Sequence, residues 1–121
     1  MSRADEMNRI LRKLQGDSPG VEASALISED GLMLTSVLPS GMEEQRVGGM
    51  GATLLNLASR VVLELGRGAV REVVVRGELG YVVMMGTRRN ALLMTVTNET
   101  SKLGMIFFDM QDAIRALERI I

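Results

Sequence analysis

The sequence contains no cysteine, no histidine and only two prolines among its 121 residues. The lack of cysteine excludes a disulfide framework and thiol chemistry, and is compatible with a reducing cytoplasm. The lack of histidine removes the commonest general base and the commonest metal ligand. No other set of residues brings together a nucleophile, a base and oxyanion donors. We therefore expect no catalytic residues, no metal site and no cofactor, so the chain should not be an enzyme.

Aromatic residues are also scarce, at 2% of the sequence, which leaves few platforms for stacking bases. The formal net charge is −1, so no general attraction to nucleic acid is expected. The longest uncharged run, from Val47 to Ser59, is shorter than the ~20 residues that span a bilayer. No targeting segment is recognisable at the N-terminus. We expect a soluble cytoplasmic protein that does not insert into membranes.

Apolar periodicity and turn residues predict three helices and five strands. Gly16 is expected to end the first helix, and Thr100 or Ser101 to cap the last one, which follows residue 101. The other expected elements are helices over Ser2–Gln15 and Met42–Gly66 and strands over Val21–Ser28, Leu32–Leu38, Val70–Arg76, Tyr81–Thr87 and Ala91–Thr97. Short hairpin links predict one α+β domain over residues 1–121, with a five-stranded antiparallel sheet, helices on both faces and the order α-β-β-α-β-β-β-α.

The helix over Met42–Gly66 carries more apolar surface than one contact covers. Apart from Ser59, its polar side chains between residues 46 and 67 form one narrow stripe: Arg46, Thr53, Asn56, Arg60, Glu64 and Arg67. A surface helix normally buries only a stripe a little over 100° wide. Leaving half a dozen apolar side chains in water would forfeit roughly 10 kcal/mol, at about 1.5–3 kcal/mol each. We therefore expect a second copy of the chain to cover this helix.

The valine-rich strand over Val70–Arg76 supports the same conclusion. If the first hairpin lies beside the last two strands, this strand falls at a sheet edge, where an unpaired strand invites association. Pairing with its two-fold mate would continue the sheet and bring the two central helices together. The expected homodimer interface consists of Val47, Met50, Gly51, Leu54, Leu55, Ala58, Val62, Val70, Glu72, Val74 and Arg76.

Three local features have alternative interpretations. The glycines of Gly48–Gly51 superficially resemble a phosphate-binding loop, but no strand precedes them, so close approach of the helix to a neighbour is the alternative. Arg88-Arg89 can bind an anion, or stabilise a transferring phosphoryl group as an arginine finger does, or form a solvated hairpin tip. The carboxylates Asp30, Glu78 and Glu99 lie beside glycines or at a helix start, which favours turn and cap roles over acid–base chemistry.

Taken together, several segments of the sequence resemble a Roadblock/LC7 domain. They are the SEDGLML hairpin (Ser28–Leu34) after a short N-terminal helix, the central helix rich in small residues, and the run Arg76–Val96. Profilin-like folds share this topology. The resemblance covers nearly the whole chain and is strongest for the compact bacterial and archaeal MglB-like members. It implies dimers with a continuous sheet, and regulation of Ras-like small GTPases or, in eukaryotes, attachment to the dynein motor.

From this resemblance we expect a non-catalytic homodimer that binds a Ras-like small GTPase and modulates its nucleotide cycle, as a GTPase-activating partner does. The polar stripe of the central helix would order the switch regions, so that the GTPase uses its own catalytic groups. The candidate contacts are Arg46, Thr53, Asn56, Arg60 and Glu64. The alternatives are a structural adaptor of a larger assembly, similar to a dynein light chain, and a profilin-like small-molecule sensor, which needs a pocket of about 300 Å³ or more.

Overall fold

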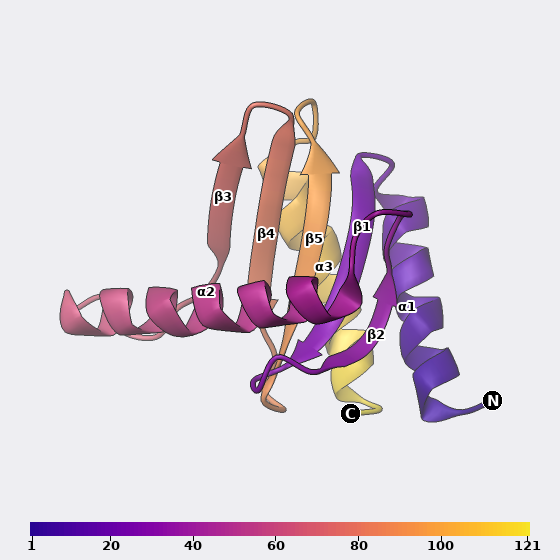
Figure 1. Ribbon diagram of the computed structural model, residues 1–121, viewed down its shortest axis with the longest axis horizontal. Coiled ribbons are helices and arrows are strands. Elements are labelled where there is room, and N and C mark those ends of the chain that lie inside the picture. The colour runs from indigo at the N-terminus through magenta and orange to yellow at the C-terminus, as the bar shows by residue number, and fades with distance from the viewer.

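The computed structural model describes all residues from Met1 to Ile121 and contains three helices and five strands in the expected order (Figure 1). The elements are α1 (Arg3–Asp17), β1 (Val21–Ser28), β2 (Met33–Val37), α2 (Glu44–Glu64), β3 (Val73–Gly77), β4 (Gly80–Gly86), β5 (Ala91–Asn98) and α3 (Leu103–Glu118). The predicted α+β class and the order α-β-β-α-β-β-β-α are confirmed.

The five strands form one antiparallel sheet in the order β2-β1-β5-β4-β3. The first hairpin therefore lies beside the last two strands, because β1 pairs with β5 along its length, and the condition set for an edge position of β3 is met. This arrangement places β2 at one edge of the sheet and the valine-rich β3 at the other. Each edge strand has a neighbour on one side only.

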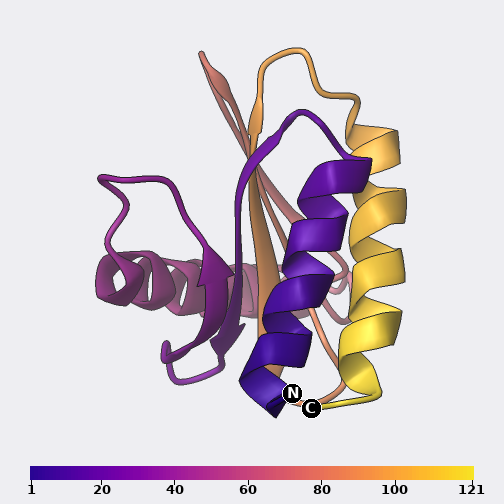
Figure 2. The same ribbon diagram turned by 90° about the vertical axis from the view of Figure 1, so that its right-hand side faces the viewer.

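Helices cover both faces of the sheet, but unequally (Figure 2). The amphipathic helices α1 and α3 lie side by side on one face and enclose a core of 13 buried residues, among them Leu11, Leu93 and Met110. On the other face α2 crosses the strands alone, over a core of 5 buried residues. The sheet is therefore well covered on the α1/α3 face and only partly covered on the α2 face. No helix has both the length and the apolar character required to traverse a bilayer.

Two predicted helix ends differ from the structure. The first helix continues through Gly16 to Asp17, and Ser18 is the C-cap, whose N–H donates to the carbonyl of Leu14 at 3.0 Å. Gly16 adopts no positive φ, so it does not end the helix. At α3 neither Thr100 nor Ser101 is the N-cap. That position belongs to Lys102, and the hydroxyl groups of Thr100 and Ser101 donate to Asn98 Oδ1, at 3.0 and 2.8 Å.

The third strand begins later than predicted. β3 starts at Val73, so Val70 and Glu72 precede it and are not edge-strand residues. The reason is the length of α2, whose C-terminal part extends past β3 (Figure 1). The chain must return from there to the sheet, and residues 65–72 make this connection.

Candidate functional site

The α2 face of the sheet contains the surface that the sequence singled out. The residues of α2 that are fully buried are all small, namely Gly48, Gly51 and Ala52. At Gly48 a Cβ atom would lie 2.4 Å from the carbonyl oxygen of Gly31, in the β1–β2 turn. At Gly51 it would lie 2.8 Å from Met94 Cε. These two glycines therefore allow α2 to approach the sheet closely, and they lie within a helix, not in a phosphate-binding loop.

An apolar groove follows the flank of α2 that faces the β3 side of the sheet. Its volume is about 370 Å³, and its walls include Val47, Met50 and Leu54 of α2 together with Val75 and Val82 of β3 and β4. Met50 is 59% exposed and Val75 is 44% exposed, so the groove is open to solvent. The groove thus reaches from the helix to the unpaired edge of the sheet.

The C-terminal half of α2 carries further exposed apolar side chains. Leu57 is 55% exposed and Leu63 is 69% exposed, and Val61 and Leu65 are exposed as well. The predicted interface residues do not include these four positions or Val75. Met50, Leu54, Leu57, Val61 and Leu65 follow helical spacing, so this periodicity identifies most of the stripe. The sequence does not show, however, that the last turns of α2 lie beyond the sheet.

The predicted interface residues fall into different environments. Val47, Leu54 and Leu55 pack partly against the chain's own core, and Ala58 and Val62 are half-buried. Gly51 is buried against the chain's own sheet and also lines the apolar groove. Met50 is exposed in the groove, and Val74 and Arg76 are exposed on β3, where the guanidinium of Arg76 lies over the Tyr81 ring at 5.9 Å.

The five predicted GTPase contacts are all exposed on the outward side of α2. They are Arg46, Thr53, Asn56, Arg60 and Glu64. None of them takes part in an ion pair, because the two ion pairs of the chain are Lys13–Asp17 and Asp112–Arg115. The stripe is therefore a continuous polar strip beside the apolar groove.

The opposite flank of α2 borders a smaller, polar cleft. Its volume is about 220 Å³, and its walls include Asn56 and Ser59 of α2, Glu29, and Thr87 and Asn90 of the β4–β5 hairpin. The two flanks of α2 thus differ in chemistry. One presents an apolar groove toward the sheet edge, and the other presents hydrogen-bonding groups toward a hairpin.

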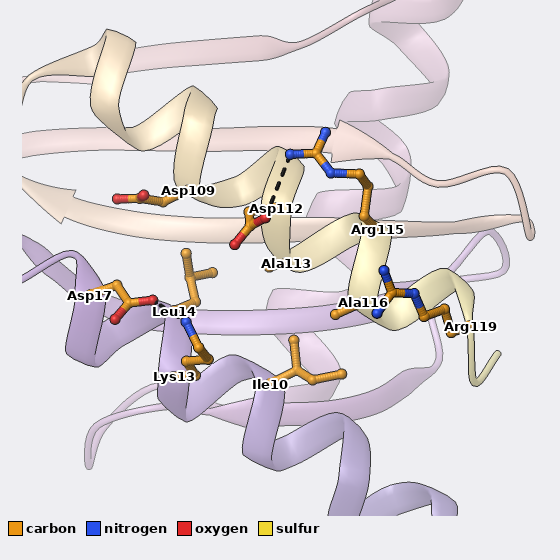
Figure 3. A pocket seen from close by; sticks show the side chains of 10 residues that line it. All are labelled: Ile10, Lys13, Leu14, Asp17, Asp109, Asp112, Ala113, Arg115, Ala116 and Arg119. Atoms are coloured by element: carbon orange, nitrogen blue, oxygen red, sulfur yellow. Dashed lines mark hydrogen bonds and ion pairs between the residues drawn. The ribbon is translucent and has the colours of Figure 1, made fainter.

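A third hollow, on the other face of the molecule, lies between α1 and α3 (Figure 3). It has a volume of about 200 Å³ and charged walls. The pKa of Lys13 is raised above its usual value, first by the hydrogen bond from its Nζ to Asp17 Oδ2 at 2.6 Å and by the charge of that carboxylate. Asp112 and Asp109 raise it further. No group of three or more His, Cys, Asp or Glu residues in the structure is arranged to hold a metal ion.

Comparison with known proteins places the chain in a family. Residues 7–98 match the model of the Roadblock/LC7 domain. The chain is also similar to Uncharacterized protein MJ1340 of Methanocaldococcus jannaschii, with 29% identity over 114 residues that cover 94% of this chain and 96% of the relative.

Solved structures share the fold at lower identity. MglB from Myxococcus xanthus superposes with a TM-score of 0.90 at 13% identity, covering 99% of this chain and 90% of MglB. The gliding protein MglB from Thermus thermophilus gives 0.85 at 21% identity, covering 99% and 91%. A chain of a LokiProfilin2–rabbit actin complex gives 0.65 at 16% identity over the full length of both, so the fold is profilin-like. The chain belongs to the Roadblock/LC7 domain family.

Proposed function

We propose that the chain is a cytoplasmic homodimer that binds a Ras-like small GTPase and modulates its nucleotide cycle, without catalytic chemistry of its own. The observation that carries the proposal is the adjacency of two unsatisfied surfaces, the apolar flank of α2 and the unpaired edge of β3. A single two-fold contact closes both, because the same patch of each copy faces the other.

The homodimer we propose pairs β3 with its two-fold mate and extends the sheet across the dimer. The C-terminal half of α2, with Leu57 and Val61, then lies over the apolar groove of the other copy. Each such side chain contributes roughly 1.5–3 kcal/mol when it becomes fully buried. This contribution, repeated in both copies, is what offsets the entropy lost on association.

The proposed GTPase contact is the polar stripe Arg46, Thr53, Asn56, Arg60 and Glu64. Its support is twofold: the stripe stays exposed when the apolar flank is buried in the dimer, and MglB shares the fold. An ordered switch region holds the catalytic groups of the GTPase in place, so the partner need not insert a residue of its own. In this mechanism the chain acts by binding one conformation of the GTPase more tightly than the others.

A GTP-hydrolysis assay tests this function. Purified Ras-like GTPases from the source organism are loaded with GTP, and single-turnover hydrolysis is followed with and without saturating chain. We expect at least one GTPase to bind and to hydrolyse GTP at least about tenfold faster. Binding without a rate change would leave a structural adaptor. No binding to any of these GTPases would refute the proposal.

The apolar groove supports one further candidate, a small-molecule sensor. Its volume of about 370 Å³ exceeds the ~300 Å³ that a ligand pocket needs. Its walls are nearly all apolar and run to a sheet edge, which suits a second polypeptide chain better than a ligand with polar groups. Native mass spectrometry separates the two: the homodimer predicts twice the mass of 13.2 kDa, whereas a sensor predicts a monomer with a bound small molecule.

A further inference from the structure

The β4–β5 hairpin presents two arginines that form no ion pair. Arg88 and Arg89 are both exposed, and the two ion pairs of the chain lie on the α1/α3 face. The carboxylate of Glu118 does contact this hairpin, but it accepts the backbone N–H of Arg88 at 2.7 Å. Both guanidinium groups are therefore available to a partner.

The backbone of this hairpin is held in place from within and from α3. Thr87 Oγ1 accepts hydrogen bonds from the backbone N–H groups of Arg89 and Ala91, both at 3.2 Å. The bond between Arg88 and Glu118 ties the tip to the end of α3. A loop that is already ordered loses little conformational entropy when it binds a partner.

The same hairpin forms one wall of the polar cleft beside α2. Thr87 and Asn90 line the cleft. Arg88 and Arg89 are the two residues between them. On the helix side Asn56 lines it, and this residue also belongs to the polar stripe of α2. The cleft therefore continues the proposed GTPase-contact stripe as far as the arginine pair.

The cleft stays open in the proposed homodimer. The flank of α2 that carries Met50 and Leu54 faces the apolar groove and the β3 edge, which the second copy would cover. The cleft lies along the opposite flank, where Ala52, Asn56 and Ser59 face the hairpin. A partner of the dimer can thus reach it without competing with the second copy.

We propose that the Arg88-Arg89 tip beside this cleft is a second contact for the small GTPase, and that it receives a carboxylate-bearing segment of its surface. This inference rests on the proposed function. Arg88 and Arg89 supply planar guanidinium groups that bind carboxylates in a bidentate manner. Glu29 is the carboxylate in the cleft wall, and the amide of Asn56 supplies a neutral hydrogen-bonding group beside it.

The contact serves docking and not the chemical step. Charged groups at the rim of an interface mainly raise the association rate and make it depend on ionic strength. The arginine pair therefore sets the concentration of this protein that is needed to saturate the GTPase. The hydrolysis rate at saturation does not depend on it, in contrast to an arginine finger.

The test compares the double variant Arg88→Glu/Arg89→Glu with a matched control, Arg3→Glu/Arg9→Glu on α1. The control makes the same change in net charge at two exposed arginines on the other face of the sheet. Binding to the purified GTPases, loaded with GDP or a non-hydrolysable GTP analogue, is measured by biolayer interferometry at two salt concentrations. We expect at least about tenfold weaker binding for the hairpin variant, mostly through slower association, and no change for the control.

Two further variants and an activity measurement complete the test. Arg88→Lys/Arg89→Lys keeps the charge but loses the bidentate geometry, so it should bind about threefold to fivefold more weakly than the wild type and more tightly than the charge reversal. Arg89→Ala should also lose about threefold to fivefold. Sedimentation should show the same homodimer for all variants. Single-turnover GTP hydrolysis at saturation should proceed at the wild-type rate for all of them.

If the wild type binds a GTPase and the charge reversal binds it equally well, the inference is wrong and the proposed function stands. A lost hydrolysis rate at saturation with unchanged affinity also overturns it. If the wild type binds none of the GTPases, the proposed function fails and this contact fails with it.

Discussion

The two faces of the sheet are built on different principles. On one face α1 and α3 bury a core of 13 residues and leave charged side chains outside, including the pair Lys13–Asp17. On the other face α2 reaches the sheet through small residues and leaves large apolar ones outside, such as Leu57 and Leu63. The first face is complete within one chain. The second resembles half of an interface, and this difference locates the surface on which a partner acts.

The two edges of the sheet differ in the same way. At the β2 edge Asn8 of α1 donates hydrogen bonds to Thr35 Oγ1 at 3.0 Å and to the carbonyl of Ser36 at 2.9 Å. At the β3 edge no helix lies alongside, and Val74 and Val75 are exposed. A protected edge resists pairing with another chain, and an unprotected one invites it. The open face and the open edge meet at β3.

The largest expected effect concerns the complete face. Leu93 is fully buried in the core beneath α1 and α3, so Leu93→Ala should reduce the free energy of unfolding by about 2–5 kcal/mol. Chemical denaturation measures this change. Leu32→Ala, at a side chain that is 67% exposed, is the control and should stay within about 0.5 kcal/mol of the wild type. Equal losses for the two variants would contradict the view that this face supplies most of the stability.

The next effect concerns the open face. Leu57→Asp should weaken self-association by about a hundredfold, or about 2.8 kcal/mol, because it places a charge in the proposed interface. The fold should remain, since Leu57 is 55% exposed in the single chain. Sedimentation equilibrium measures the first quantity and circular dichroism the second.

The matched control for that experiment is Asn56→Asp, which introduces the same charge on the flank of α2 that lines the polar cleft. It should leave the dimer intact. A wild-type chain that sediments as a monomer at micromolar concentration would remove the interface altogether.

A smaller effect distinguishes the glycines of α2. In Gly48→Ala the new Cβ meets the carbonyl oxygen of Gly31 at 2.4 Å, so the helix must move away from the β1–β2 turn, and stability should fall by about 1–3 kcal/mol. In Gly49→Ala no atom lies within 4 Å of the new Cβ. That variant should gain up to about 1 kcal/mol, because alanine favours a helix over glycine. Thermal unfolding of both proteins gives the comparison, and a gain at both sites would show that the close approach is not needed.

Much of this architecture could be predicted from the sequence, because periodicity and turn residues are local signals. These signals give the element order, the edge position of β3, and the excess of apolar surface on α2 over what one contact covers. The close approach to the sheet expected for the three glycines of Gly48–Gly51 is found at Gly48 and Gly51, but not at Gly49, where a Cβ would have no neighbour within 4 Å. Local patterns show that a residue faces something, but they do not show which of two neighbours it faces.

The remaining errors have a common physical cause. The start of β3 depends on where α2 leaves the sheet, and the N-cap of α3 falls on Lys102, one residue beyond the predicted Ser101. The polar cleft joins Asn56 to Asn90, which are far apart in the sequence. Each of these facts depends on tertiary packing. The arginine pair at the hairpin could be recognised in the sequence, but its position beside α2 could not.

The smallest expected effect concerns the exposed charges on the α1/α3 face, which should contribute little to the free energy of unfolding. The raised pKa of Lys13 means that its pairing with Asp17 favours the charged amine in the folded state. The stabilisation is therefore fully present below the ordinary pKa of about 10.5 and is lost as the pH rises through the higher folded value. Asp17→Asn should remove the hydrogen-bonded carboxylate and flatten the fall in stability above about pH 10.5 relative to the wild type. Because this ion pair is exposed, the difference should be smaller than that for either glycine and should shrink further in added salt. A difference in the free energy of unfolding as large as that of Leu93→Ala, measured by denaturation at several pH values, would contradict this expectation. The charged hollow between α1 and α3 would then be essential to the fold, and the contrast between the two faces would not rest on the apolar core alone.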